Sequence, residues 1–200
     1  MEQNWAAEHL QVIRTLMERS AVYRRALAPL MTFAGILGML AAWVGSSRHY
    51  DSPRNFVLFW GTVSIAALCG TFVLVRRQAL RAGEPLWSPP TRRVSQALLP
   101  CMFLGAVAAG FVWFQGGADL LPAIWIVLYG CALHAAGFFM PRGMRLFGWC
   151  FVLAGAAMLF LNALGKFDFS PHWIMGFFFG FLHLAYGTYL YFTEQRRNPA

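Results

Sequence analysis

Charged residues are scarce in this chain. Asp, Glu, Lys and Arg together make up 12% of its 200 residues, whereas 58% are hydrophobic. Soluble domains carry about 25% charged residues, so this chain lacks the polar surface that a soluble fold needs. The length suits one compact unit. The composition therefore excludes an ordinary soluble domain and predicts a protein that lies in a lipid bilayer.

Acidic residues are the rarest charged group, and none lies in a long apolar stretch. The chain has 8 acidic and 16 basic residues. Transport coupled to protons or sodium through a buried carboxylate is therefore disfavoured. The basic residues fall in short runs between apolar stretches, as in membrane loops, and not on one face or domain. We therefore expect no nucleic-acid partner.

Motifs for catalysis and for metal binding are missing as well. The sequence has neither a phosphate-binding G-x-x-x-x-G-K-[ST] loop nor an H-E-x-x-H zinc motif. Its four cysteines lie in apolar stretches and form no C-x-x-C pair, so disulfides and zinc sites are not expected. They are Cys69, Cys101, Cys131 and Cys150. We predict a protein that is not an enzyme, with no catalytic residue and no metal site.

Six long apolar stretches follow one another along the chain. A helix needs about 20 apolar residues to cross the hydrocarbon core of a bilayer. Backbone polar groups must be paired within such a segment, so each stretch is expected to be a helix. The stretches are residues 26–45, 56–75, 97–114, 121–140, 146–164 and 173–192. The sequence predicts an all-α, polytopic membrane protein whose transmembrane domain covers residues 26–192.

The basic residues predict how the chain is oriented. Thirteen of the 16 fall at one end of the predicted helices and three at the other. The positive-inside rule places the crowded side in the cytoplasm. The three exceptions are Arg48, Arg54 and Lys166. We expect a multi-pass protein of a bacterial inner membrane, with both termini in the cytoplasm.

Besides the short loop at residues 141–145, three segments lie outside the predicted membrane core on the cytoplasmic side. Residues 1–25 have apolar side chains at helical spacing and predict a short amphipathic helix. Residues 76–93 form a loop whose prolines interrupt a continuous helix, and residues 193–200 form a tail. The first two segments are candidate contacts for a cytoplasmic protein partner. The lipid bilayer and a second copy of the chain are the other expected partners.

The even-numbered stretches share a pattern that predicts an internal repeat. Each begins with a proline at the outer end, continues with aromatic residues and reaches a glycine eight or nine residues later. The prolines are Pro53, Pro122 and Pro171, and the glycines are Gly61, Gly130 and Gly180. The odd-numbered stretches have small residues in the middle, which let helices approach closely in lipid. The chain is expected to form three parallel helical hairpins, each pairing a small-residue helix with an aromatic one.

This layout resembles that of a known family. In length, span count and hairpin organisation the sequence resembles the HdeD family of bacterial six-span membrane proteins, which are built from glycine-rich hairpins. The resemblance implies the arrangement of the hairpins alone. It carries no site residue and no activity over to this chain.

Two histidines occupy equivalent positions in the predicted repeat. His134 and His183 each lie twelve residues after the proline of their stretch, whereas the same position in the second stretch is Ile65. Polar groups inside a membrane are costly, which makes these rings the first candidates for function. Tyr129 and Tyr186 lie close to them in the sequence. The four side chains His134, His183, Tyr129 and Tyr186 form the predicted ligand-binding site.

Three interpretations of the histidine pair stay open. Each ring can hydrogen-bond to a neighbouring helix and stabilise packing. The four residues can instead line a polar or proton-sensitive ligand site, since histidine titrates in the physiological range. The third interpretation is haem ligation by His134 and His183 from two helices at one depth. A separate site on the outer loops is a minor alternative, formed by Asp51, Asp119 and Asp168 with His49 and His172.

These observations lead to three functional hypotheses. The first is a non-catalytic membrane module that binds a partner or small ligand, with a sensory or accessory role. The second is a channel or facilitator for a neutral or weakly polar solute, based on the repeated hairpins and paired histidines. The third is a haem-binding redox membrane protein.

Overall fold

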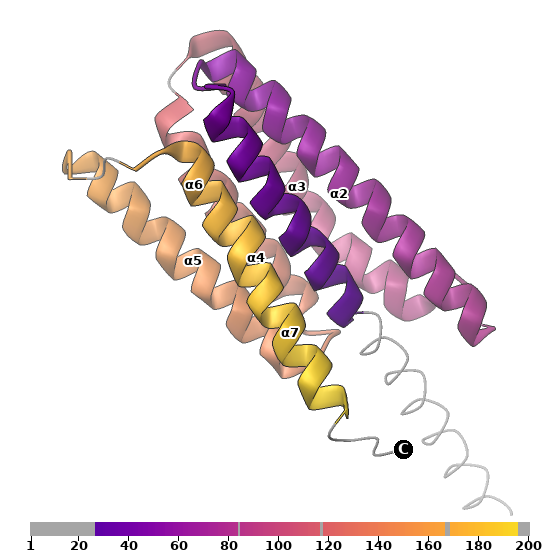
Figure 1. Cartoon of the computed structure of the whole chain (residues 1–200). Coiled ribbons are helices and arrows are strands. Elements are labelled where there is room, and N and C mark those ends of the chain that lie inside the picture. Colours follow the sequence, from indigo (N-terminus) through magenta and orange to yellow (C-terminus); the bar gives the residue numbers. More distant parts are fainter. Residues whose placement is uncertain (1–26, 84, 117, 167–168, 196–200) are drawn as a thin grey trace, which may run out of the picture.

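The fold is an all-helical bundle. The computed structural model describes residues 27–83, 85–116, 118–166 and 169–195. Within these ranges the chain has no strand, and six helices are long and apolar enough to cross a membrane (Figure 1). The expectation of an all-α, multi-pass membrane protein is confirmed at this level. The predicted amphipathic helix at residues 1–25 and most of the tail at 193–200 lie outside the described residues.

The helices follow one another with short connections. The first helix covers Leu27–Ser47 and is followed by α2 (Pro53–Ala82) and α3 (Pro89–Gln115). A single 3₁₀ turn, η1 (Ala118–Leu120), leads into α4 (Leu121–Ala136), and α5 (Arg142–Ala163) comes next. The sixth span is built from three consecutive pieces: α6 (Pro171–Met175), the π-helical η2 (Gly176–Phe181) and α7 (Leu182–Gln195). Its π-helical segment is a local widening of the helix of the kind that often occurs at functional sites.

The three predicted helix starts at prolines are confirmed. Pro53 and Pro171 are the first residues of α2 and α6, and Pro122 is the second residue of α4. A proline in the first helical turn gives up no hydrogen bond, because the N–H groups there have no partner within the helix. Ser52 adds a cap to α2, since its hydroxyl accepts from the backbone N–H of Asn55 at 3.4 Å.

The connection between α2 and α3 is shorter than the sequence indicated. The stretch 76–93 was expected to be a loop, but α2 continues to Ala82 and α3 already begins at Pro89. Backbone hydrogen bonds do not depend on apolar side chains, so α2 continues beyond the end of its long apolar stretch at Val75. It stops at Gly83, whose φ of 64° lies in the left-handed region that glycine tolerates best. The prolines still interrupt the helix, over a short segment.

Helices α2 and α3 present large apolar side chains that no other part of the described chain covers. In water such a surface would be strongly unfavourable, whereas lipid chains solvate it. On α2 these side chains are Leu58, Ile65, Leu68, Phe72 and Val73, and on α3 they are Leu99, Phe103, Leu104, Val107 and Phe111. The exposed surface of this pair of helices therefore fits a lipid environment.

Glycines set the closest helix contacts in the bundle. A Cβ on Gly38 of the first helix would lie 2.5 Å from the carbonyl oxygen of Phe179, and one on Gly35 would lie 2.5 Å from the backbone nitrogen of Leu184. Figure 1 shows the first helix alongside α6 and α7. The backbones can approach this closely only because these positions carry no side chain. The first helix thus packs tightly on the sixth span, which is far away in the sequence.

Glycines on α4 and α3 also contact neighbouring helices. On α4, a Cβ at Gly130 would lie 2.7 Å from the backbone of Val152 in α5. On α3, the carbonyl of Gly105 accepts from the indole of Trp125 in α4 at 2.9 Å. The α3–α4 contact lies within one predicted hairpin, whereas the α4–α5 contact and the contact of the first helix with the sixth span join different hairpins. The three-hairpin arrangement is not confirmed. The contacts of Gly35, Gly38 and Gly130 agree with the predicted role of small residues in close packing.

Candidate functional site

Two of the predicted site residues, Tyr129 and His183, are joined by a hydrogen bond inside the bundle. Nε2 of His183 lies 2.8 Å from the hydroxyl of Tyr129, and Nδ1 lies 2.9 Å from the carbonyl of Phe178. A carbonyl oxygen can only accept, so Nδ1 carries the proton, and Nε2 of the neutral ring accepts from the Tyr129 O–H. Both ring nitrogens are therefore satisfied. An iron ion at Nε2 would have to displace Tyr129, and haem ligation stays a prediction that nothing here tests.

Aromatic rings enclose this hydrogen-bonded pair. The His183 ring is 2% exposed, and it meets Phe147 and Phe151 at centroid distances of 5.4 and 5.6 Å. Tyr186 belongs to the same group because it stacks on Phe147 at 4.6 Å. These residues come from α4, α5 and the sixth span. Their contacts hold the three helices together, which is what a packing role for His183 requires.

The fourth predicted residue, His134, lies in a different environment. Its ring packs edge-on against Phe138 and Trp149, at centroid distances of 5.4 and 5.3 Å. Its Nδ1 is buried and has no hydrogen-bond partner among the described residues. Tyr129 and His134 are five residues apart, which rotates them by about 140° around α4, so only Tyr129 is directed toward His183. Whether the four predicted residues bind a ligand is untested.

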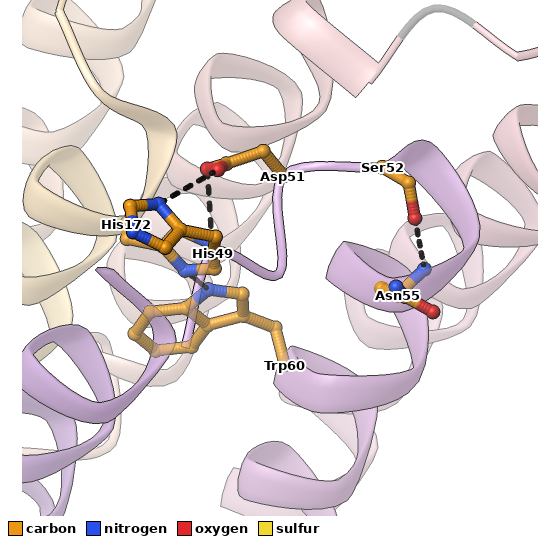
Figure 2. A network of polar contacts seen from close by, with 6 residues as sticks. All are labelled: His49, Asp51, Ser52, Asn55, Trp60 and His172. Atoms are coloured by element: carbon orange, nitrogen blue, oxygen red, sulfur yellow. Dashed lines mark hydrogen bonds and ion pairs between the residues drawn. The ribbon is translucent and has the colours of Figure 1, made fainter. Parts of the chain in front are cut away.

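A third histidine lies in a polar group at the end of the bundle that has only three of the 16 basic residues. His172 is fully buried, and its Nδ1 lies 3.1 Å from the indole nitrogen of Trp60 (Figure 2). An indole N–H only donates, so Nδ1 is the bare nitrogen and Nε2 carries the proton of the neutral ring. Nε2 is buried and has no hydrogen-bond partner of good geometry among the described residues, although the backbone of Tyr50 lies beside the ring. Buried polar atoms are rarely left in this state, so this nitrogen needs an explanation.

The side chain that faces this nitrogen is Asp51. Its Oδ1 lies 3.7 Å from Nε2 of His172, and its Oδ2 lies 3.8 Å from Nδ1 of His49 (Figure 2). The Asp51 and His49 side chains are 60% and 86% exposed, so the group opens outward. A separation of 3.7 Å is too long for a direct hydrogen bond. We call His49, Asp51, Trp60 and His172 together the His172 site.

Local structure fixes each member of the His172 site. Pro171 starts α6 and places His172 in its first turn, while Trp60 lies two turns into α2. The connecting loop turns tightly after the first helix, with the N–H of Tyr50 donating to the carbonyl of Gly45 at 3.2 Å. Any side chain on Gly45 would collide with Nδ1 of His172. The close approach of the first helix to the imidazole therefore depends on glycine at this position.

His49 has an unusual backbone conformation in this loop. Its φ of 54° makes it the one residue other than glycine with a positive φ in the described chain. The left-handed region costs an L-residue about 1 kcal/mol or more, and histidine is among the side chains that enter it more often. Such strain is common beside binding sites. The conformation keeps the His49 ring beside Asp51.

The His172 site presents a hydrogen-bond donor, the Nε2–H of His172, next to an acceptor, the carboxylate of Asp51. Metal coordination requires a bare ring nitrogen, but Trp60 occupies the bare nitrogen of His172 and leaves an N–H toward Asp51. Among the residues that the structure describes, no group of three or more His, Cys, Asp or Glu side chains is arranged so that it could hold a metal ion. A small polar group that accepts from Nε2–H and donates to the carboxylate fits this geometry.

Sequence reasoning identified part of this site. His49, His172 and Asp51 appeared together in the minor alternative for the outer loops, and the structure brings these three together. No ion pair joins Asp119 to them in the described structure, and Asp168 lies outside the described residues. Trp60 was missed, since it is 112 positions away from His172 and an aromatic residue in an apolar stretch carries no distinguishing signal.

Comparison with protein-family models, with curated proteins and with solved structures finds no match for this chain. The functional argument therefore depends on the geometry of the bundle itself.

Proposed function

We propose that this protein is a non-catalytic membrane module that binds a small polar ligand at the His172 site. The observation that carries the proposal is the buried Nε2 of His172, which has no hydrogen-bond partner of good geometry within the described ranges and faces the exposed carboxylate of Asp51 across 3.7 Å. One ligand group beside the two atoms, at about 2.8 Å from each, would satisfy both. A sensory or accessory role follows, since a module without catalytic groups acts by changing its contacts when a ligand binds.

The chemistry of the site limits the class of ligand. The group between the two residues must accept from an N–H and donate to a carboxylate, which hydroxyls and primary amides do and purely apolar groups do not. The surrounding rings of Phe56 and Phe59, at 5.2 and 6.0 Å from the His172 ring, favour a ligand with a compact apolar part. Small alcohols, amino alcohols and amides are therefore the first compounds to test.

The test is ligand-dependent thermal stability of the full-length protein in lipid nanodiscs. Glycerol, ethanolamine and acetamide serve as probes, and at least one is expected to raise the Tm, because ligand binding to the folded state stabilises it. Asp51→Asn should reduce that rise, since the neutral amide oxygen accepts a hydrogen bond more weakly than the carboxylate does. Asp119→Asn, a change of the same kind at the same end of the bundle, should leave it intact. An equal rise in both variants, or none in the wild type, would contradict the proposal.

The finer topology belongs to the same proposal. We place the chain in a bacterial inner membrane with both termini in the cytoplasm, so that the His172 site faces outward. The uneven distribution of arginine supports this orientation. Labelling of single cysteines introduced at Gly83 and at Ser47 with an impermeant reagent in intact cells tests the orientation, because only Ser47→Cys should react.

Three further proposals concern other parts of the chain. They are the three parallel hairpins, a cytoplasmic partner at residues 1–25 and 76–93, and a ligand role for His134, His183, Tyr129 and Tyr186.

A further inference from the structure

A shallow recess lies at the arginine-rich end of the bundle, between the first helix and α2. Its volume is about 110 Å³. Its lining consists of Pro29 from the first helix and Leu74, Arg77, Gln78 and Arg81 from the last turns of α2. The recess combines two guanidinium groups and an amide with an apolar side. It is far along α2 from Trp60 and the His172 site, so it requires an explanation of its own.

The two arginines of the recess carry like charges on one face of the helix. Arg77 and Arg81 are four residues apart, a spacing at which side chains are neighbours and like charges repel. Neither forms an ion pair with an acidic side chain in the described part of the chain. An anion held between them would remove the repulsion. Guanidinium groups match phosphate oxygens with paired hydrogen bonds, so phosphate is the anion that fits best.

The depth of the recess indicates where that phosphate comes from. The 23 residues from Pro53 to Val75 contain one charged residue, Arg54, at their far end. A helix of this length covers about 34 Å, slightly more than the hydrocarbon core of about 30 Å. Arg77 therefore lies at the level of the lipid headgroups, and Arg81 lies one turn farther out. Leu74 lies one turn inside, where acyl chains begin.

We propose that this recess is a binding site for an anionic phospholipid, with the headgroup phosphate held by Arg77 and Arg81. Gln78 adds an amide donor to the phosphate, and the glycerol and upper acyl chain lie against Leu74 and Pro29. The ligand is a lipid of the same leaflet. Free phosphate shares the anionic chemistry but has no group that would use the apolar side of the recess.

The test is lipid binding to the full-length protein in detergent, measured by native mass spectrometry during titration with phosphatidylglycerol. Removing two arginines at this depth should weaken the binding of the first lipid about 30-fold. The variant is R77Q/R81Q. The matched control is R92Q/R93Q, which removes the same charge at the start of α3 on the same side but outside the recess. The control is expected to stay within about threefold of the wild type. Unchanged thermal stability of both variants shows that they are folded.

Further variants and competing ligands identify what the recess binds. R77K/R81K keeps both charges and loses the planar fork, so its affinity should fall between those of the wild type and R77Q/R81Q. If R77Q/R81Q fails to fold, this milder variant provides the comparison. Phosphatidylcholine should bind weakly, and inorganic phosphate should not displace the lipid at equal concentration. Equal losses in R77Q/R81Q and R92Q/R93Q, equal binding of the two lipids, or full displacement by phosphate would each overturn the proposal.

Discussion

The indole of Trp60 donates to Nδ1 of His172 across 3.1 Å, between residues that are 112 positions apart in the chain. This hydrogen bond fixes which ring nitrogen carries the proton, because the donor has to meet a bare nitrogen. The remaining N–H is thereby directed toward the carboxylate of Asp51. A residue outside the opening of the site thus determines which hydrogen bonds the site can offer.

Trp60→Phe should destabilise the protein by about 1–3 kcal/mol. The change keeps an aromatic ring and removes the donor, which leaves Nδ1 of His172 buried without a partner. The free energy of unfolding, measured by SDS titration in mixed micelles, checks this expectation. The matched control is Trp43→Phe, since Trp43 is 61% exposed toward lipid and should cost less than about 0.5 kcal/mol. Equal losses at the two positions would show that the hydrogen bond does not stabilise the fold.

Tyr129→Phe should cost about 1 kcal/mol, because His183 then loses the hydroxyl that satisfies Nε2, and hydrogen bonds between membrane helices contribute on this scale. Tyr186→Phe is the control. Tyr186 stacks on Phe147 in the same aromatic group, and the described structure gives its hydroxyl no hydrogen bond. The same SDS titration should show a smaller loss for this second variant. A larger loss at Tyr186 would mean that the Tyr129–His183 hydrogen bond is not the stabilising contact.

Gly38→Ala should destabilise the contact between the first helix and the sixth span by about 2 kcal/mol, in the range for overpacked cores. Its Cβ would lie 2.5 Å from a backbone carbonyl oxygen of η2, and backbone cannot move aside as a flexible side chain can. Gly61→Ala provides the comparison, since a Cβ there meets nothing within 4 Å. Alanine favours a helix over glycine, so this variant should be neutral or up to about 1 kcal/mol more stable. Thermal unfolding in nanodiscs that ranked the two variants the other way would contradict the packing described above.

His49→Val should lower stability by about 1–2 kcal/mol, whereas His49→Asn should leave it nearly unchanged. The backbone at this position has a φ of 54°, which a β-branched side chain adopts with strain and asparagine adopts readily. Both variants remove the imidazole, so their difference isolates the backbone effect. Unfolding by SDS measures it. Equal stability of the two variants would indicate that the loop does not keep this conformation in solution.

The sequence was informative about elements whose signals are local. The prolines that open α2, α4 and α6 mark helix starts because their effect on the backbone is confined to one turn. The end of α2 and the start of α3 were predicted less accurately. The arginines that flank each apolar stretch mark the edge of the hydrocarbon core. The end of α2 is instead set by Gly83, and the start of α3 by Pro89.

Contacts between distant residues could not be read from the chain. The tight packing of Gly38 against Phe179 joins the first helix to the sixth span, and small residues alone do not reveal their partner. His183 and Tyr129 were both selected because polar side chains in lipid are costly, and they turned out to be partners. His134 was grouped with them by depth alone. The angular position around α4 directs it elsewhere.

The most direct test of the account is the protonation pattern of the His172 ring in the full-length, ¹⁵N-histidine-labelled protein in nanodiscs. Nitrogen–proton correlation NMR, with the His172→Gln variant to assign the signal, distinguishes the two neutral tautomers. We predict a proton on Nε2, a bare Nδ1, and a shift of the Nε2–H signal when the probe that raises the Tm is added. A proton on Nδ1, or an Nε2–H signal that does not respond to that probe, would contradict a ligand site between His172 and Asp51.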